Sequence, residues 1–551
     1  MKQYRAKHQG HVERTIAEAI NLGLTRIGLT ILLIIVAILA LASLVTTYIF
    51  PYTNFETPFN SFSYVLVSLP LIGGALYFIT KFSYFNRVQS SRVIAVCASI
   101  SFLFSIIWVS IFSSYPPNAD QWIAVNCAQM LHNNEVDLLN QSGLLQVYPF
   151  QTGLVLWNEL VGSLFGFSNW TAFRLLGCIS VPIIVLFLSR TAELVFDNSK
   201  VGSVCAILST VFLPLSCYAS FIYGTLPSLA ASLIAFWFQI RAIRIQANDA
   251  GKCLRLGIIS CVMFFIALFF KLNSLIFLIA AEAVWFFTAI LRKSGGLLII
   301  CMLNIAVYFS SSFIPNYIVE NRTGIEVGSG VPKTAWIVMG LQESDRAAGW
   351  YNEYVTQYWG AAIDGSYDAY QNANKQIEAD LSERINEFCS NPLYAVDFFS
   401  EKVLTQWSEP TFQSLWCSFT GTGTVSQDGK LAGVNASFDG DSLLQSSLLD
   451  GMLHKGYVVY CDTFQSIVYI MIVAGLVFML RRPTELHSAI FAIALFGGII
   501  FHVLWEAKSC YTFTYFLTAL PIAAQGILYI RGFIMRNSTT RTTLHHLRDA
   551  N

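Results

Sequence analysis

Long apolar stretches constrain this chain more than any other feature of its sequence. About 20 apolar residues cross the hydrocarbon core of a bilayer, and twelve stretches come near that length: 28–50, 63–80, 93–113, 174–195, 202–219, 226–243, 255–271, 274–292, 296–314, 463–480, 487–505 and 513–531. Hydrophobic residues fill 55% of the 551 positions and charged residues only 12%, which leaves too few polar side chains to coat a soluble globule. The sequence therefore predicts a polytopic α-helical membrane protein with about 12 transmembrane helices.

The charge and the cysteine content argue against several classes of partner. The formal net charge is zero and no run of like charges occurs, so we expect no nucleic-acid partner. The twelve cysteines form no CxxC pair and show no Cys/His ligand spacing, and most lie inside apolar stretches, where cysteine acts as a small hydrophobic side chain. We therefore predict no metal site, no cofactor and no disulfide framework.

One shorter stretch, 152–166, decides the topology because Asn158 and Glu159 lie at its centre. If it lies flat at the outer interface, every short basic loop falls on one side of the membrane, as the positive-inside rule requires. These loops hold Lys81, Arg87 and Arg92; Arg241, Arg244, Lys252 and Arg255; Arg292 and Lys293; Arg481 and Arg482; and Arg531, Arg536, Arg541 and Arg548. We therefore expect an interfacial helix over 152–166 and two cytoplasmic termini.

This topology divides the chain into five parts. Residues 1–92 form a basic cytoplasmic leader, retained rather than cleaved, and two N-terminal spans. Residues 93–314 form a transmembrane core with an outer loop over 114–173. Residues 315–462 form an extracytoplasmic domain, 463–531 three C-terminal spans, and 532–551 a cytoplasmic tail.

The segment 315–462 is long enough for a small domain of its own. Its residues 366–389 show apolar positions at helical spacing, and Asn391-Pro392 reads as the cap and first turn of a second helix to about 407. After Cys417 the chain is rich in Gly, Ser, Thr and Asp to about 442, which predicts a mobile loop. Cys389, Cys417 and Cys461 allow at most one bridge.

Several polar residues at span ends fall on the same predicted outer side as Asp120, which lies in Tyr115-Pro-Pro-Asn-Ala-Asp-Gln-Trp122 just after the third stretch. They are Arg174, Lys271, Asn273, Glu506 and Lys508. Charges beside a membrane are costly, so they commonly pair or serve a ligand pathway. Asp120 together with three bases on the outer face suits a phosphate-bearing ligand.

Simpler roles exist for each of these residues. Lys271 or Arg174 alone can extend from a helix end to the interface, and Asp120 can cap a helix over 121–132. We interpret Glu135 and Asp137 as solvated loop acids, and His132, His545 and His546 as lacking partners at ligand spacing. Together these residues indicate a ligand site more strongly than any one of them does alone. The topology that places them on one side of the membrane was inferred without using them.

In the order of its motifs, the chain resembles the GT-C superfamily of membrane glycosyltransferases, which includes protein O-mannosyltransferases and bacterial aminoarabinose transferases. The likeness covers most of 93–531 and rests on Asp120, Tyr148-Pro-Phe-Gln-Thr-Gly-Leu154, Phe165-Gly-Phe-Ser-Asn-Trp-Thr-Ala-Phe-Arg174 and Tyr223-Gly-Thr-Leu-Pro227. A branch found in Gram-positive bacteria is similar at Ala335-Trp-Ile-Val-Met-Gly-Leu341, Gly349-Trp-Tyr-Asn352, Gln406-Trp-Ser-Glu-Pro410 and Glu506-Ala-Lys-Ser509.

The resemblance implies a GT-C-like core in the bacterial plasma membrane with an extracytoplasmic active site. It implies an inverting transfer of one sugar from a polyprenyl-monophosphate donor to an acceptor that is a surface glycan, a lipid or a protein. Asp120 would be the catalytic base, and Arg174, Lys271 and Lys508 would bind the donor phosphate. Supporting positions would be Tyr148, Tyr223, Asn273, Glu409, Glu506 and Tyr511.

The chain departs from the family pattern at three positions. Cys510 stands where an arginine is expected, Thr225 where an acid is common, and Gln121 where some relatives have an acid, so metal dependence is not implied.

Two alternatives stay open. A repeat-unit glycan polymerase would rely on outer arginines and a diphosphate donor. A transporter or lipid flippase would place polar residues or broken helices near the middle of spans, whereas the charges singled out here lie at span ends.

Overall fold

The computed structural model describes residues 2–49, 57–60, 66, 68–70, 73–74, 88–112, 116–117, 119–418, 447–448 and 451–533. Most of the predicted span 63–80, the predicted loop to about 442 and most of the predicted tail 532–551 lie outside these residues. The described chain is mainly helical, and its one sheet pairs β1 (Thr46–Ile49) antiparallel with β2 (Thr57–Asn60), Thr46 facing Asn60.

Nine helical segments of the described chain are long and apolar enough to cross a membrane. They are the part Glu18–Ser43 of α1 (Lys2–Ser43), the part Ser90–Ile111 of α4 (Ser90–Phe112), α9 (Trp170–Phe196), α12 (Thr225–Ile245), α13 (Ala250–Phe270), η3 with α14 (Leu272–Ser274, Leu275–Leu291), α15 (Gly295–Thr323), α22 (Met452–Leu480) and η5 with α23 (Leu486–Ala489, Ile490–Leu504). This set of long apolar helices fits an integral membrane protein.

Two further predicted spans are bent rather than straight. Helix α10 (Ser199–Val211) and the segment Leu213–Ser220, made of α11 (Leu213–Cys217) and η2 (Tyr218–Ser220), meet at 63°, and α24 (Ser509–Thr518) meets the helix Leu520–Phe533 at 49°. Pro214 and Pro521 lie directly after the breaks, where a proline removes one backbone donor and disfavours a helical residue before it. With both pairs counted as spans, the described chain holds up to eleven.

The first predicted span ends earlier than expected. The sequence predicted 28–50, but α1 stops at Ser43 and the chain then forms β1. Strand β1 is held against the rest of the protein: the Tyr48 N–H donates to the Ser408 carbonyl at 3.0 Å, and Thr47 donates to the Asp462 carboxylate. The prediction failed here because Thr46, Thr47 and Tyr48 continue the apolar run but favour strand.

The stretch 152–166 forms α8 (Thr152–Phe165), a helix of 14 residues. Such a helix is about 21 Å long at roughly 1.5 Å per residue, too short to cross about 30 Å of hydrocarbon. The Glu159 carboxylate pairs with both terminal nitrogens of Arg322 at 2.8 and 2.7 Å, which ties α8 to the end of α15. The predicted helix is present and ends one residue earlier than expected, at Phe165; its place at the outer interface stays a prediction.

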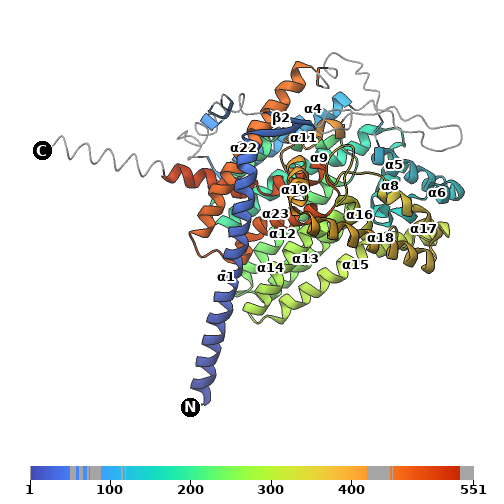
Figure 1. The fold of residues 1–551 in the computed structure, drawn as a ribbon. Helices are drawn as coiled ribbons and strands as arrows, with labels where there is room; N and C mark the ends of the chain where they lie inside the picture. The colour runs from blue at the N-terminus through green and yellow to red at the C-terminus, as the bar shows by residue number, and fades with distance from the viewer. Residues whose placement is uncertain are drawn as a thin grey trace.

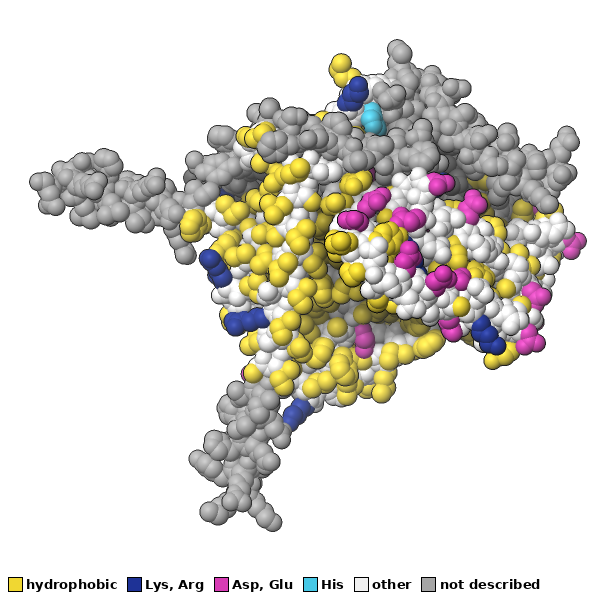
Figure 2. Space-filling model, in the orientation of Figure 1, with side chains coloured by type: hydrophobic (Ala, Val, Ile, Leu, Met, Phe, Trp, Pro, Cys, Tyr) yellow, Lys and Arg dark blue, Asp and Glu magenta, His cyan; other side chains and the backbone are white. Residues whose placement is uncertain are grey.

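The remaining helices form a region beside the spans. They are α5 (Ala119–His132), α6 (Val136–Ser142), α7 (Leu144–Val147), η1 (Pro149–Gln151), α16 (Thr334–Gly340), η4 (Tyr354–Tyr358), α17 (Trp359–Asp364), α18 (Tyr367–Ser390), α19 (Pro392–Trp407) and α20 (Ser414–Ser418). Helices α5, α6, α8, α16, α17 and α18 lie together at the right of Figure 1. Figure 2 shows acidic side chains on this part of the surface beside a broad apolar face.

Both helices predicted in 366–407 are confirmed. Helix α18 covers Tyr367–Ser390, and the Asn391 side chain caps α19 by accepting from the Tyr394 N–H at 3.3 Å. Cysteines 389, 417 and 461 are free thiols. The two spans on either side of the segment 315–462 are longer than predicted. Helix α15 continues to Thr323, and α22 already begins at Met452.

Two of the predicted basic loops, the one after α12 and the one after α14, meet at one end of the bundle. Arg244, at the end of α12, pairs with Asp197 after α9 at 3.3 Å, and the Arg292 guanidinium after α14 donates to the Ile243 carbonyl at 2.6 Å. Arg190 pairs with Glu193 at 2.8 Å. The opposite ends of these helices carry the residues described in the next subsection.

One polar pair lies away from the span ends. Glu282, in the middle of α14, accepts a hydrogen bond from the Asn304 amide of α15 at 2.9 Å. Gln239 of α12 donates to the Ala281 carbonyl at 2.7 Å. The sequence interpretation, which weighed only charges at span ends, overlooked this intramembrane carboxylate.

Close helix packing at Gly526 gives the first testable consequence. A Cβ there would overlap the Met471 carbonyl of α22, whereas Gly532, on the same helix, faces open space. We expect Gly526→Ala to lower the free energy of unfolding by about 1–3 kcal/mol through overpacking. Thermal unfolding in detergent measures this, with Gly532→Ala as the matched control; equal midpoints for the two variants would contradict the packing.

Candidate active site

Asp120 lies in the first turn of α5 and is exposed. The simpler role considered for Asp120, capping a helix over 121–132, does not fit, because the helix already begins at Ala119. A carboxylate in this position is favoured by the partial positive charge of the helix N-terminus. The Tyr223 hydroxyl donates to its Oδ2 at 3.4 Å, so one hydrogen bond orients the carboxylate.

The turn 221–224 connects Asp120 to the spans. Gly224 has a φ of +72° and approaches the Phe270 carbonyl so closely that a Cβ would clash with it; glycine alone meets both conditions without strain. Next to Asp120, the Gln121 side chain accepts from the Ile222 N–H at 2.7 Å, and Gln151 donates to the Tyr223 hydroxyl at 2.8 Å. The turn is therefore fixed between α5, η1 and the end of α13.

Lys271 follows α13 and is half-buried beside this turn. Its ammonium donates to the Thr225 hydroxyl at 2.8 Å and lies 4.9 Å from the centre of the Tyr223 ring. Burial lowers the pKa of Lys271, opposed by neighbouring thiols and by the charge of Asp120. Thr225 thus supplies a neutral partner for the lysine.

Glu506 and Lys508 lie in the segment that joins α23 to α24. The Lys508 ammonium lies between two indoles, 5.5 Å from the centre of Trp350 and 5.4 Å from that of Trp416. Burial lowers the pKa of Lys508, but Glu506 and then Asp120 outweigh it, so the pKa is raised overall. Burial raises the pKa of Glu506, which also accepts a hydrogen bond from the Tyr511 hydroxyl at 3.3 Å.

Three tyrosines add neutral hydroxyls around Asp120. Burial first, and then the charge of Asp120, raises the pKa of Tyr148 and of Tyr223. Burial also raises the pKa of Tyr351 to about 12, with Glu353, Glu506 and Asp120 adding to the shift. These phenols therefore stay protonated at neutral pH and act as hydrogen-bond donors.

A small cavity borders the site between three spans. Its lining comes from α12 (Thr225, Ser228, Leu229), from the turn and start of α14 (Lys271, Asn273, Ser274, Phe277) and from α24 (Cys510, Tyr511, Thr514). Its volume of about 20 Å³ accommodates roughly one water molecule. The described residues contain no group of three or more His, Cys, Asp or Glu side chains able to hold a metal ion.

Comparisons with known proteins give limited information beyond this geometry. No protein-family model matches the chain, and no curated protein matches its sequence. Among solved structures, the chain is similar to the apo crystal structure of the Archaeoglobus fulgidus oligosaccharyltransferase, with a TM-score of 0.42 and 14% identity over 84% of this chain and 53% of that chain. The chain thus spans about half the length of that protein. At this level of similarity neither activity nor substrate follows.

Two of the predicted site residues, Arg174 and Glu409, are buried and hydrogen-bonded to other groups of the protein. Arg174 is 1% exposed at the start of α9, and its Nε donates to the Ser220 carbonyl at 3.3 Å. Glu409 is fully buried, where its carboxylate accepts from the Thr411 and Gln413 N–H groups and from the Ser509 hydroxyl. Both side chains hold backbone segments near the site, and a role for either in binding a substrate stays a prediction.

Several residues near Asp120 were not chosen from the sequence. Gln151 lies inside one quoted motif and Tyr351 inside another, so these motifs were a usable signal. Arg346 has no such signal, because it lies in a loop without periodicity.

Lys402 of α19, also not chosen, is fully buried, and its ammonium donates to the Gly340 carbonyl at the end of α16. Burial lowers its pKa to about 7, with Glu506 opposing the shift. Between pH of about 7 and the unfolded value of about 10.4, the folded protein binds fewer protons than the unfolded chain, so this group makes stability rise with pH.

We therefore expect wild-type protein to gain stability relative to Lys402→Met as the pH is raised from about 7 to about 9. Thermal unfolding across this range measures the difference. The exposed Lys333 supplies the control Lys333→Met, whose offset from wild type should not vary with pH. A constant offset for Lys402→Met would show that Lys402 keeps an ordinary pKa in the folded protein.

Proposed function

We propose that the protein is an inverting membrane glycosyltransferase that moves a sugar from a polyprenyl-monophosphate donor to a hydroxyl acceptor. The observation that carries this proposal is the convergence of one exposed carboxylate, Asp120, with two half-buried lysines, Lys271 and Lys508, beside a small cavity between spans. These three residues come from chain segments about 150 and 240 residues apart.

Asp120 is the general base in this proposal. Its Oδ1 accepts the proton of the acceptor hydroxyl while that oxygen attacks the anomeric carbon. The bond from the anomeric carbon to the donor phosphate oxygen breaks on the opposite face, and the polyprenyl phosphate leaves with the electron pair. One displacement of this kind inverts the anomeric centre. The Tyr223 hydroxyl holds the other carboxylate oxygen.

The lysines supply charge for the departing phosphate. Negative charge grows on the leaving oxygen, and cations fixed in a water-poor site stabilise it strongly because they need no reorganisation. Lys271 suits this task since its only described polar partner is the neutral Thr225 hydroxyl. Because the cavity beside it has room for about one water molecule, the phosphate would lie at the cavity mouth, with the polyprenyl chain along the spans.

The proposed placement in the cell follows from charge. The end of the bundle that carries Arg244 and Arg292 is the cytoplasmic one under the positive-inside rule, together with both termini. The site would then face outward from a bacterial plasma membrane, toward a surface glycan, lipid or protein acceptor. Donor and acceptor would meet there without a metal ion.

Replacing the proposed base tests the mechanism directly. Asp120→Asn is nearly isosteric and unable to take the proton, so transfer from synthetic polyprenyl-phosphate sugars should fall by about 10²- to 10⁴-fold. The exposed Asp137 provides the control Asp137→Asn, which should keep wild-type turnover. The amount of product formed is measured by chromatography. Near-normal turnover by Asp120→Asn would remove Asp120 from the mechanism.

Removing the charge of Lys271 should weaken donor binding and the stabilisation of the leaving phosphate instead. We expect Lys271→Ala to raise the donor KM and lower kcat, with a total loss in kcat/KM of roughly 10²-fold for a charge-assisted contact. Lys252→Ala, at the basic end of the bundle, is the matched control. Unchanged donor kinetics in Lys271→Ala would leave Lys271 as a structural residue.

Two outcomes with the wild-type protein would favour the alternative functions. Higher transfer rates from diphosphate than from monophosphate donors would favour the polymerase, and movement of substrate across the membrane without glycosyl transfer would favour the transporter.

A further inference from the structure

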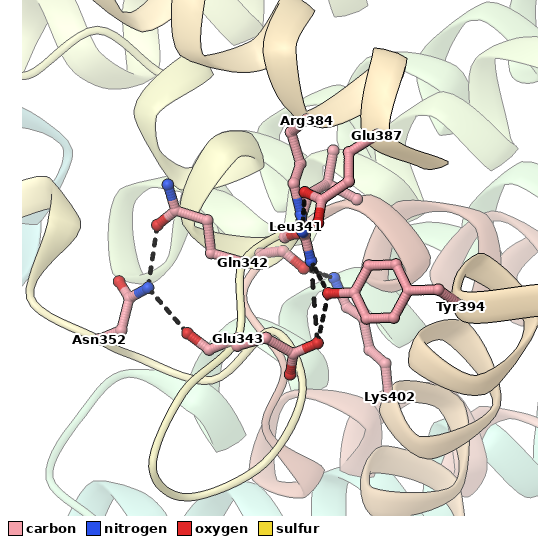
Figure 3. A network of polar contacts seen from close by, with 9 residues as sticks. Leu341, Gln342, Glu343, Asn352, Arg384, Glu387, Tyr394 and Lys402 are labelled. Atoms are coloured by element: carbon pink, nitrogen blue, oxygen red, sulfur yellow. Dashed lines mark hydrogen bonds and ion pairs between the residues drawn. The ribbon is translucent and has the colours of Figure 1, made fainter. Parts of the chain in front are cut away.

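The loop 341–353 is closed on itself rather than extended. At its neck, Asn352 donates to the Gln342 side chain at 2.9 Å and to the Glu343 carbonyl at 3.2 Å, and the Gly349 N–H donates to the Gln342 carbonyl at 2.9 Å. Arg384 of α18 joins this neck from outside, because it contacts the Leu341 carbonyl, Glu343, Glu387 and Tyr394 (Figure 3). The loop therefore has a defined shape.

The loop is also attached to the candidate active site. The Ala507 N–H, between Glu506 and Lys508, donates to the Gly349 carbonyl at 2.7 Å. Gly349 has a φ of +75°, and a Cβ there would meet the Gly340 carbonyl and the stem of Lys402. Only glycine allows this approach. The tip of the loop is thus positioned relative to Lys508.

Arg346 lies at this tip and is half-exposed. Its guanidinium lies 5.9 Å from the centre of the Trp350 ring, and the Lys508 ammonium lies 5.5 Å from the centre of the same ring. Its charge influences the pKa values of Glu506, Lys508 and Tyr351, although burial is the largest influence on each. Among the described residues, no carboxylate lies within ion-pair distance of Arg346.

The site has two poles with Asp120 between them. At one pole Lys271 borders a cavity built by α12, α14 and α24, all parts of candidate spans. At the other, Arg346 is carried by a loop among α16, η4, α18 and α19, none of which is a candidate span. The charge of Asp120 acts on Lys271 at the first pole and on Lys508 and Tyr351 near the second. On the proposed function, a lipid-linked phosphate would reach the first pole from the bilayer, and a ligand from the aqueous phase would reach the second.

We propose that Arg346 binds an anionic group of the acceptor, so that the acceptor is a chain carrying phosphate or carboxylate groups beside the hydroxyl that is glycosylated. This inference rests on the proposed function, since it assigns the acceptor to the second pole. An arginine fork pairs in a bidentate manner with either anion. The ring of Trp350 holds the guanidinium in place through a cation–π contact, which reduces the entropy lost on binding.

Binding in the absence of donor tests this assignment separately from catalysis. The probes are a fluorescent glycerol-phosphate hexamer, a hexagalacturonate and a neutral maltohexaose, titrated against the full-length protein in nanodiscs with anisotropy as the readout. We expect the wild-type protein to bind at least one anionic probe more tightly than the neutral one. Arg346→Gln should weaken that binding by about tenfold, and Arg346→Lys by less because it keeps the charge without the fork.

The control is Lys333→Gln, which removes an exposed charge next to α16 and should leave all three affinities unchanged. Thermal midpoints equal to wild type show that the loop variants are folded. Preference for phosphate or for carboxylate identifies the anion. The proposal is overturned if no anionic probe binds better than maltohexaose, or if Arg346→Gln weakens all three probes equally. Because no transfer is measured, inactivity toward polyprenyl-phosphate sugars would contradict the proposed function and leave this result standing.

Discussion

The high cost of placing a charge in hydrocarbon determines where this protein keeps its ionisable side chains. Lys271 and Lys508 tolerate partial burial because Asp120 and Glu506 lie near them and aromatic rings cover them. Removing the two lysine charges would leave the carboxylates without a nearby cation, and removing the carboxylates would leave the lysines without a nearby anion. The positions of four helix ends, which bring these charges together, are therefore coupled to one another.

Backbone contacts, more than ion pairs, hold this arrangement. The turn 221–224 is fixed by Gln121 and by the close approach of Gly224 to α13. The segment 505–508 is fixed by the loop 341–353 through Ala507 and Gly349. The site is thus assembled from short non-helical segments between rigid spans, which keeps its carboxylate exposed while its cations stay largely dry. Such preorganisation is what electrostatic catalysis needs.

Length and hydropathy predicted most of the spans, since the described chain holds nine candidates, or up to eleven with the two bent pairs, against the twelve expected. Asp120, Lys271 and Lys508, which the positive-inside rule put on one side, lie close enough for the charge of Asp120 to act on both lysines, and their roles stay predictions. Prediction from the sequence failed where local chemistry competes with hydropathy, as at the strand Thr46–Ile49. It also missed Arg346 and Lys402, since their roles depend on contacts between α16, α19 and the loop 341–353 that no periodic pattern encodes. Arg174 was expected at the ligand, yet its contact with the Ser220 carbonyl depends on how α9 packs.

The central claim is that Asp120 and its cations lie on the side of the membrane opposite the basic loops. In a Cys389→Ser background, where the other native cysteines are buried, an impermeant maleimide added to intact cells should label Asp120→Cys and not Asn248→Cys. Permeabilised cells should label both. Labelling of position 248 in intact cells, with position 120 protected until permeabilisation, would contradict the account.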